Sequence, residues 1–203
     1  MAYPTVSAPY GMIPVKMVNG NPYNGATRAY KIQSGNTDVI FNGDVVGLAV
    51  DGYVDRTAFD AAIPAVGVFI GCSYTDPTYG LTFRNYYPGS VTASDITAYV
   101  VDDPNVLFKM AVTNGSGVIS ELGQNAVGSN FAGDEGASAN GSTTTGKSYG
   151  GIDATSLATT ATLPFRVVEG VEETKNASGN YTEVLVKWNA GHQLTNTTGL
   201  AGS

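Results

Sequence analysis

One stretch of the sequence has the spacing of a phosphate-binding loop. Residues 141–148 read GSTTTGKS, which places two glycines, a lysine and a serine as the Walker A motif requires. Such a loop cradles phosphate only between a buried strand and the N-terminus of a helix. No apolar strand precedes the stretch, and Tyr149-Gly150-Gly151 after it disfavours a helix. We therefore interpret it as a Gly/Ser/Thr-rich loop and predict no nucleotide or other cofactor.

The single cysteine and the single histidine restrict the remaining reactive chemistry. Cys72 cannot form an intrachain disulfide and lies in an apolar run, so we expect a small buried hydrophobe. One residue of each type cannot build a zinc site of the usual Cys/His kind, and no metal is predicted. A Ser–His–Asp triad would need His192, which we expect either at the surface or packed against Trp188. The sequence thus predicts no catalytic residue, and we interpret the chain as a protein without enzymatic activity.

Adjacent acidic residues occur at 102–103, 134–135 and 172–173. Because sequence neighbours on a strand point to opposite faces, no pair forms by itself the facing carboxylates of a glycosidase. Asp102 and Asp103 precede Pro104, a pattern typical of a turn. Calcium binding by these acids stays open as an alternative, although the spacing of an EF-hand is missing.

Tyrosines are the best candidates for contacts with a partner protein, because tyrosine buries a large area and keeps a polar tip. Tyr86 and Tyr87 precede Pro88-Gly89, and alternation predicts that only one of the two points into the core. Arg28 is expected to be held in an ion pair with an acid such as Asp44. The candidate contacts are Tyr3, Tyr10, Tyr23, Arg28, Tyr86 and Tyr87.

Length, composition and charge limit the class of protein. The 203 residues suggest one domain, or one domain with a sizeable insertion. Only 13% of residues are charged, while glycine (26) and tyrosine (12) are abundant, as in a turn-rich β protein with a neutral polar surface. The net charge is −7 and the ten Lys/Arg residues are scattered along the sequence, which argues against nucleic-acid binding. Without a secretory signal or a membrane-length apolar run, we expect a soluble protein made in a cytoplasm, with no membrane partner.

Alternation of apolar and polar residues between turn signals predicts a mainly β fold. The expected strands before residue 113 are 28–33, 38–41, 44–50, 65–72, 81–87, 96–101 and 106–112. Within 81–87, the side chains of Leu81, Phe83 and Asn85 share one face. A hairpin of 163–171 and 181–188 follows. We predict an antiparallel barrel or sandwich, and the pattern leaves both architectures open.

The β domain is expected over 28–188, between two extended ends. Four prolines in 1–27 favour extended backbone, so this segment is interpreted as an N-terminal arm that either drapes over neighbouring subunits or packs on its own domain. Residues 113–162 are expected to form a loop-rich insertion, with a short helix at 117–127 and a Gly/Ser/Thr-rich central loop region after it. Residues 189–203 are expected to be a mobile C-terminal tail.

Six segments spread over most of the chain form an ordered set of motifs. They are PYGMIPVKMVNGNPYNGATRAYKI at 9–32, GVFIGCSYTDP at 67–77, NYYPG at 85–89, AYVVDDPNVLF at 98–108, TGKSYGGID at 145–153 and EVLVKWNAGHQL at 183–194. In this order they resemble a widespread family of tailed-bacteriophage virion proteins, the head decoration or cement proteins. The number and order of the motifs carry the resemblance, since none is diagnostic alone. The chain departs from the family at Ile13, where relatives often carry a basic residue.

The resemblance implies a structural virion protein on the outer surface of a phage capsid. Such a protein binds the major capsid protein, stabilises contacts between its subunits and forms a homo-oligomer, which we expect to be a trimer at local threefold positions. The tyrosines and Arg28 named above then become candidate capsid or oligomer contacts. Two other functions stay open: a phage tail or receptor-side module that binds glycans, and a hydrolase or nucleotidase.

Overall fold

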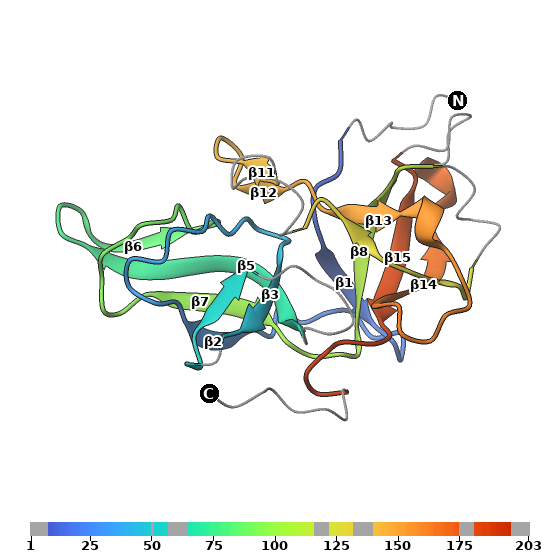
Figure 1. Ribbon diagram of the computed structural model, residues 1–203, viewed down its shortest axis with the longest axis horizontal. Helices are drawn as coiled ribbons and strands as arrows, with labels where there is room; N and C mark the ends of the chain where they lie inside the picture. Colours follow the sequence, from blue (N-terminus) through green and yellow to red (C-terminus); the bar gives the residue numbers. More distant parts are fainter. Residues whose placement is uncertain are drawn as a thin grey trace.

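The computed structural model describes residues 8–49, 51–56, 65–115, 122–131, 140–174 and 181–195. The chain is mainly β, as the sequence predicts, and its strands form two lobes that lie side by side (Figure 1). A small hairpin of β11 (Gly141–Ser142) and β12 (Lys147–Ser148) lies beside the junction of the lobes.

The first lobe is a six-stranded antiparallel sheet in the order β2-β7-β5-β3-β4, with β6 paired to the second half of β5. Its strands are β2 (Arg28–Lys31), β3 (Val45–Leu48), β4 (Val54–Arg56), β5 (Ala65–Asp76), β6 (Gly80–Arg84) and β7 (Thr97–Val101). Asp76 closes the β5–β6 turn, because its Oδ1 accepts hydrogen bonds from the amides of Thr78 and Tyr79 at 2.8 and 3.0 Å. These two strands form a hairpin at the outer end of the lobe (Figure 1).

The second lobe is a seven-stranded sheet in the order β10-β13-β8-β15-β14-β9, with β1 also paired to β8. Its strands are β1 (Ile13–Met17), β8 (Val106–Thr113), β9 (Asn125–Ala126), β10 (Gly128–Ser129), β13 (Gly151–Asp153), β14 (Phe165–Gly170) and β15 (Glu183–Trp188). Strands β9 and β10 lie at opposite ends of this order, yet only Val127 separates them in sequence. The sheet therefore nearly closes into a barrel. The hairpin predicted from the sequence is confirmed as the antiparallel pair β14–β15.

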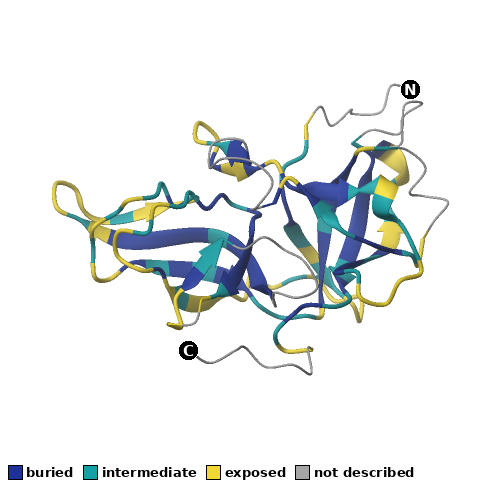
Figure 2. Ribbon diagram, in the orientation of Figure 1, coloured by how far each residue is buried: buried dark blue, intermediate teal, exposed yellow. Residues whose placement is uncertain are grey.

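The two lobes share the first part of β5. Val66 and Phe69 pack in the core of the first lobe, whereas Ala65 and Val68 pack in the core of the second. Both faces of the strand are therefore buried here (Figure 2), which explains why this segment is a continuous apolar run instead of a strict alternation.

Residues 8–27, expected as an arm, pack on the chain's own second lobe. Strand β1 pairs with β8, Met12 is fully buried in the core of the second lobe, and the Gly11 amide donates to the Gly150 carbonyl at 2.9 Å. Pro14 is compatible with a strand because β1 is an edge strand whose register shifts just after this proline. Of the two expectations for the arm, packing on its own domain is correct for residues 8–27, and the domain boundary at residue 28 is wrong. Residues 1–7 lie outside the described part of the chain.

The expected loop-rich insertion at 113–162 belongs largely to the second lobe. It supplies β9, β10 and β13 to the sheet, and it places Phe131 and Ile152 in the core. The helix expected at 117–127 is wrong for its described part, where residues 122–123 form a turn and β9 pairs with β14. Helical geometry in the described residues is confined to two 3₁₀ turns, Ala154–Ser156 and Glu172–Thr174.

In the first lobe, the observed strands differ from the predicted ones in two smaller ways. The strand expected at 38–41 is reduced to one bridge, between Ile40 and Tyr87. Strand β4 lies where the sequence predicts a loop, because its three residues are too few to show a period.

Candidate docking surfaces

The N-terminal tyrosines make their contacts within the chain. The hydroxyl of Tyr10 donates to Glu183 Oε1 at 2.5 Å, and its ring lies 5.7 Å from the Nζ of Lys109. Burial and the nearby Glu183 carboxylate raise the pKa of Tyr10, so the phenol keeps its proton. Tyr23 is half-buried against the core of the second lobe, and its hydroxyl donates to the Ala26 carbonyl. Tyr3 lies outside the described residues.

Arg28 is held by an acid, but the acid is not the expected Asp44. The Nε of Arg28 lies 3.0 Å from Asp102 Oδ2, which also accepts a hydrogen bond from the Tyr30 hydroxyl at 2.9 Å. The pairing of β2 with β7 sets this contact, because Arg28 lies opposite Val100, two residues before Asp102. Arg28 is thus exposed yet fixed, which suits a contact residue.

Alternation correctly predicts that one residue of the Tyr86–Tyr87 pair points inward. Tyr87 is fully buried in the core of the first lobe, and its hydroxyl donates to the Asn36 carbonyl at 3.0 Å. Its assignment as a partner contact is therefore wrong. Tyr86 is half-buried and stacks on Phe41, with ring centroids 5.9 Å apart.

The three most exposed large apolar side chains of the described residues are neighbours on the β5–β6 hairpin. Tyr79, Leu81 and Phe83 are 80%, 64% and 68% exposed, and we call them the hairpin face. Figure 2 shows this end of the molecule as largely exposed. As expected, Leu81 and Phe83 share one face of their strand, opposite Thr75 and Ser73 of β5. The sequence did not reveal that this face points to solvent, because alternation alone does not tell which side of a strand is covered.

A groove of about 390 Å³ adjoins the hairpin face on the same sheet. Its lining includes Phe83, Tyr99, Ile70 and Gly71. A Cβ atom at Gly71 would lie 2.8 Å from the Arg84 carbonyl oxygen, so bare backbone forms part of the lining. The Tyr99 hydroxyl lies 3.0 Å from that of Ser73. The groove is mainly apolar, with hydroxyl groups at its edge.

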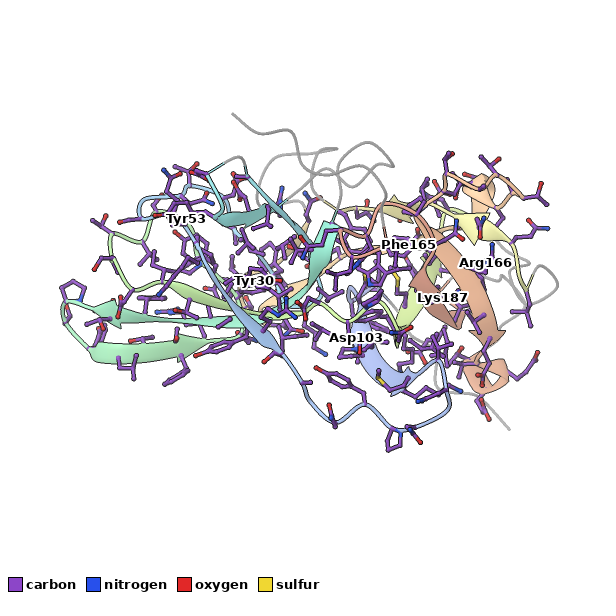
Figure 3. The ribbon with its side chains drawn as sticks, turned by 90° about the horizontal axis from the view of Figure 1, so that it is seen from below. Tyr30, Tyr53, Asp103, Phe165, Arg166 and Lys187 are labelled. Carbon is purple, nitrogen blue, oxygen red and sulfur yellow. The ribbon has the colours of Figure 1, made fainter. Side chains whose placement is uncertain are left out.

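Four of the chain's ten basic residues lie on one outer face of the second lobe, although they are far apart in the sequence. Strand pairing aligns Lys16 with Leu107, Leu185 with Lys109, and Arg166 with Lys187. We call this side the cationic face; its basic residues are Lys16, Lys109, Arg166 and Lys187. Figure 3 shows Arg166 and Lys187 close together on the second lobe, with Tyr30 on the first.

The charges of the cationic face are only partly balanced. Lys16 pairs with Glu169 at 2.7 Å, and Lys109 pairs with Glu183 at 3.0 Å. Arg166 donates to the amide oxygen of Asn125, and neither Arg166 nor Lys187 forms an ion pair with a described carboxylate. Like charges directly opposite each other on paired strands repel, so this arrangement favours an anionic partner.

Apolar side chains surround the two unbalanced cations. A groove of about 280 Å³ is lined by Val18, Leu107, Val168, Arg166 and Lys187, among others. Val18 and Val168 are exposed, as is the nearby Leu122 next to Gly123 of the same groove. This face therefore combines positive charge with exposed aliphatic surface.

Two ionisable residues are buried at the junction of the lobes. Asp44 accepts a hydrogen bond from the Phe41 amide at 2.8 Å, and burial raises its pKa to about 6 against the opposing effects of Ser148, Phe41 and Arg56. His192 packs on Trp188 with ring centroids 5.1 Å apart, and burial lowers its pKa. The expected packing on Trp188 is confirmed. The prediction of a mobile C-terminal tail is wrong for residues 189–195, because the Gln193 amide donates to the Ala65 carbonyl beside His192.

The reactive residues of the sequence are held apart in the fold. Burial raises the pKa of Cys72 to about 12, so its thiol stays protonated. The Walker-like stretch is the β11–β12 hairpin, in which Lys147 is exposed and no helix follows. Among the described residues, no three His, Cys, Asp or Glu side chains come together as a metal site.

A polar cavity of about 480 Å³ opens on the second lobe. Its lining includes Tyr149, Tyr181, Asn114 and Asn130, together with Thr113. Asn114, Asn130 and Tyr181 have left-handed backbone, with φ of 54°, 57° and 59°. The described lining contains no carboxylate, so the paired acids of a glycosidase are missing from it.

No protein-family model, curated protein or solved structure matches the chain. No helix within the described residues is long and apolar enough to cross a membrane.

Proposed function

We propose that this chain is a structural virion protein that binds the outer surface of a phage capsid and stabilises contacts between major capsid protein subunits. The ordered motifs that resemble the decoration proteins support the capsid as the partner. The observation that carries the binding function, towards the capsid or towards further copies of the chain, is the presence of two exposed apolar surfaces, the hairpin face and the cationic face.

Clusters of exposed apolar side chains are candidate interaction sites. Monomeric soluble proteins rarely expose contiguous apolar patches beyond a few hundred Å², and larger patches mark interaction sites. Full burial of one such side chain contributes about 1.5–3 kcal/mol, whereas association costs at least about 4 kcal/mol. A single hairpin therefore binds weakly, and several copies bound together gain avidity. This balance between the free energies of burial and of association favours a homo-oligomer, as the resemblance to decoration proteins implies.

The proposed mechanism is stabilisation by binding. A protein that binds the assembled shell but not the free subunits shifts the equilibrium towards the shell, by about 2.7 kcal/mol at a hundredfold excess over the dissociation constant. The low charge of this chain suits the mechanism, because few charged groups have to leave water when it docks.

The test uses expanded phage heads that lack this protein. The purified chain is expected to co-sediment with the heads, to saturate, and to raise the temperature at which they release DNA. Lys147→Ala is the matched control, because it removes an exposed cation from the β11–β12 hairpin without touching either apolar surface. Heads that bind no protein, or that release DNA at an unchanged temperature, would contradict the proposal.

Glycan binding is the second candidate, and one observation favours it. The polar cavity brings two tyrosines and two asparagines together, which could stack on a sugar and bond its hydroxyls. A glycan array with a reproducible hit that Tyr149→Ala abolishes would support this candidate over capsid binding.

A further inference from the structure

We propose that the hairpin face of one copy docks on the cationic face of a second copy, so that the chain associates head to tail. The proposal rests on the homo-oligomer of the proposed function and names the two surfaces that would form it. It also gives a role to the two exposed apolar surfaces, which the chain's own fold leaves uncovered.

The hairpin face offers projecting side chains, and the cationic face offers a groove. Tyr79, Leu81 and Phe83 are exposed on the β5–β6 hairpin. This hairpin lies at the outer end of the first lobe (Figure 1). The cationic face offers a groove with an aliphatic lining that includes Val18 and Val168. A projecting aromatic side chain that enters such a groove is the usual form of an interface anchor.

The charges at the two surfaces are also complementary. Asp76 closes the turn beside Tyr79, and Asp95 accepts two hydrogen bonds from Thr75, which lies opposite Leu81. On the other side, Arg166 and Lys187 have no described acid to pair with. Complementary charges of this kind set the register of docking and speed the encounter.

Basic residues near the hairpin face and acidic residues near the cationic face do not cancel this charge complementarity. On the first lobe, Lys31 lies beside Asp95 and Arg84 stands at the inner end of β6, away from the turn. On the second lobe, Glu169 is already neutralised by Lys16. Asp76 is therefore the acid best placed to approach Arg166 and Lys187.

The two surfaces lie on different lobes, with the hairpin at the outer end of the first (Figure 1). One molecule cannot cover its own surfaces in this arrangement, and a single head-to-tail contact between two molecules leaves one surface of each kind open. Such a heterologous contact builds a ring where the rotation closes and a filament where it does not. A closed ring of a few copies covers both surfaces, so the capsid would contact other exposed parts of each copy, such as the candidate contact Arg28.

The interface is small, so we expect weak pairing in solution. Specific interfaces bury about 800 Å² on each partner, and contacts below that size are transient. Confinement on a capsid would raise the local concentration and strengthen the pairing.

The test mixes two variants that each lack one surface. Arg166→Glu with Lys187→Glu reverses the charges of the groove, and Leu81→Ser with Phe83→Ser removes the hairpin anchor. Sedimentation velocity at protein concentrations up to about 1 mM should show that the wild type self-associates. The dissociation constant of each double variant should be at least about tenfold higher. An equimolar mixture of the two variants should restore a dimer, because the intact hairpin of one fits the intact groove of the other.

The controls separate this interface from other causes. Lys147→Glu reverses an exposed cation elsewhere and should self-associate as the wild type does. Trp188 fluorescence checks folding, and Arg166→Gln with Lys187→Gln replaces the charge reversal if that variant does not fold. A wild type that stays monomeric, variants that associate normally, or a mixture that fails to pair would each overturn the proposal. Capsid binding is measured separately on the wild type, so failure here leaves the proposed function standing.

Discussion

Asp44 and His192 show how single buried side chains depend on the contact between the lobes. The Asp44 carbonyl accepts a hydrogen bond from Phe69 of β5, while its side chain interacts with Ser148 of β12. His192 lies beside Ala65, at the start of the same strand. Both side chains are fully buried, and burial disfavours the charged form of each, which raises the pKa of Asp44 and lowers that of His192.

The raised pKa of Asp44 predicts the direction in which the free energy of unfolding changes with pH. Its folded pKa of about 6 exceeds the ordinary 3.8, so the folded state holds the proton more tightly than the unfolded state. This group therefore favours folding at low pH, and its contribution is lost as pH rises from about 4 through 6, on the order of 3 kcal/mol in all. Asp44→Asn should gain stability relative to the wild type by up to that amount between pH 4 and pH 7, measured by urea unfolding.

His192 has the opposite effect on the pH dependence of stability, so it serves as the control. Its lowered pKa means that protonation favours the unfolded state, so its contribution is lost as pH falls below 6.5. His192→Gln should therefore gain relative stability towards acid pH. A stability difference between Asp44→Asn and the wild type that stays constant with pH would refute the account of Asp44.

At the scale of elements, strands of at least four residues between clear turn signals could be predicted. Strands β5, β7, β8, β14 and β15 all show an apolar pattern bounded by Asp, Pro or Gly. Strands β9 to β13 could not be predicted, because two or three residues show no period and pairing with distant strands fixes them. Strand β1 was hidden by Pro14, which an edge strand tolerates.

The candidate surfaces were harder to predict than the strands. Position in the sequence suggested Tyr10 and Tyr87 as outward contacts, but both bond within the chain because other strands cover them. The cationic face was invisible for a different reason. Its residues come from four strands, and only the pairing of β1, β8, β15 and β14 aligns Lys16 with Arg166.

At the scale of the whole molecule, the shared strand β5 joins two cores into one cooperative unit. Cys72 lies in the core of the first lobe and Trp188 in that of the second, and each is the only residue of its type. Since Val68 on β5 packs against the second core while Val66 packs against the first, neither lobe can lose its packing alone.

The two lobes are therefore expected to unfold together. In a guanidinium titration, Trp188 fluorescence and the reactivity of the Cys72 thiol should change with the same midpoint, as in a two-state transition. Val68→Ala, in the shared part of β5, should lower both midpoints equally. A thiol that becomes reactive while the tryptophan signal is still native would show that the lobes unfold independently.

The central claim is that this chain works by adhering to a protein lattice in many copies. Quantitative mass spectrometry of purified virions tests this most directly by counting copies of the chain per particle. We predict copies in proportion to the major capsid protein, in the hundreds. Virions that lack the chain, or that carry only the few copies of a tail component, would contradict the claim.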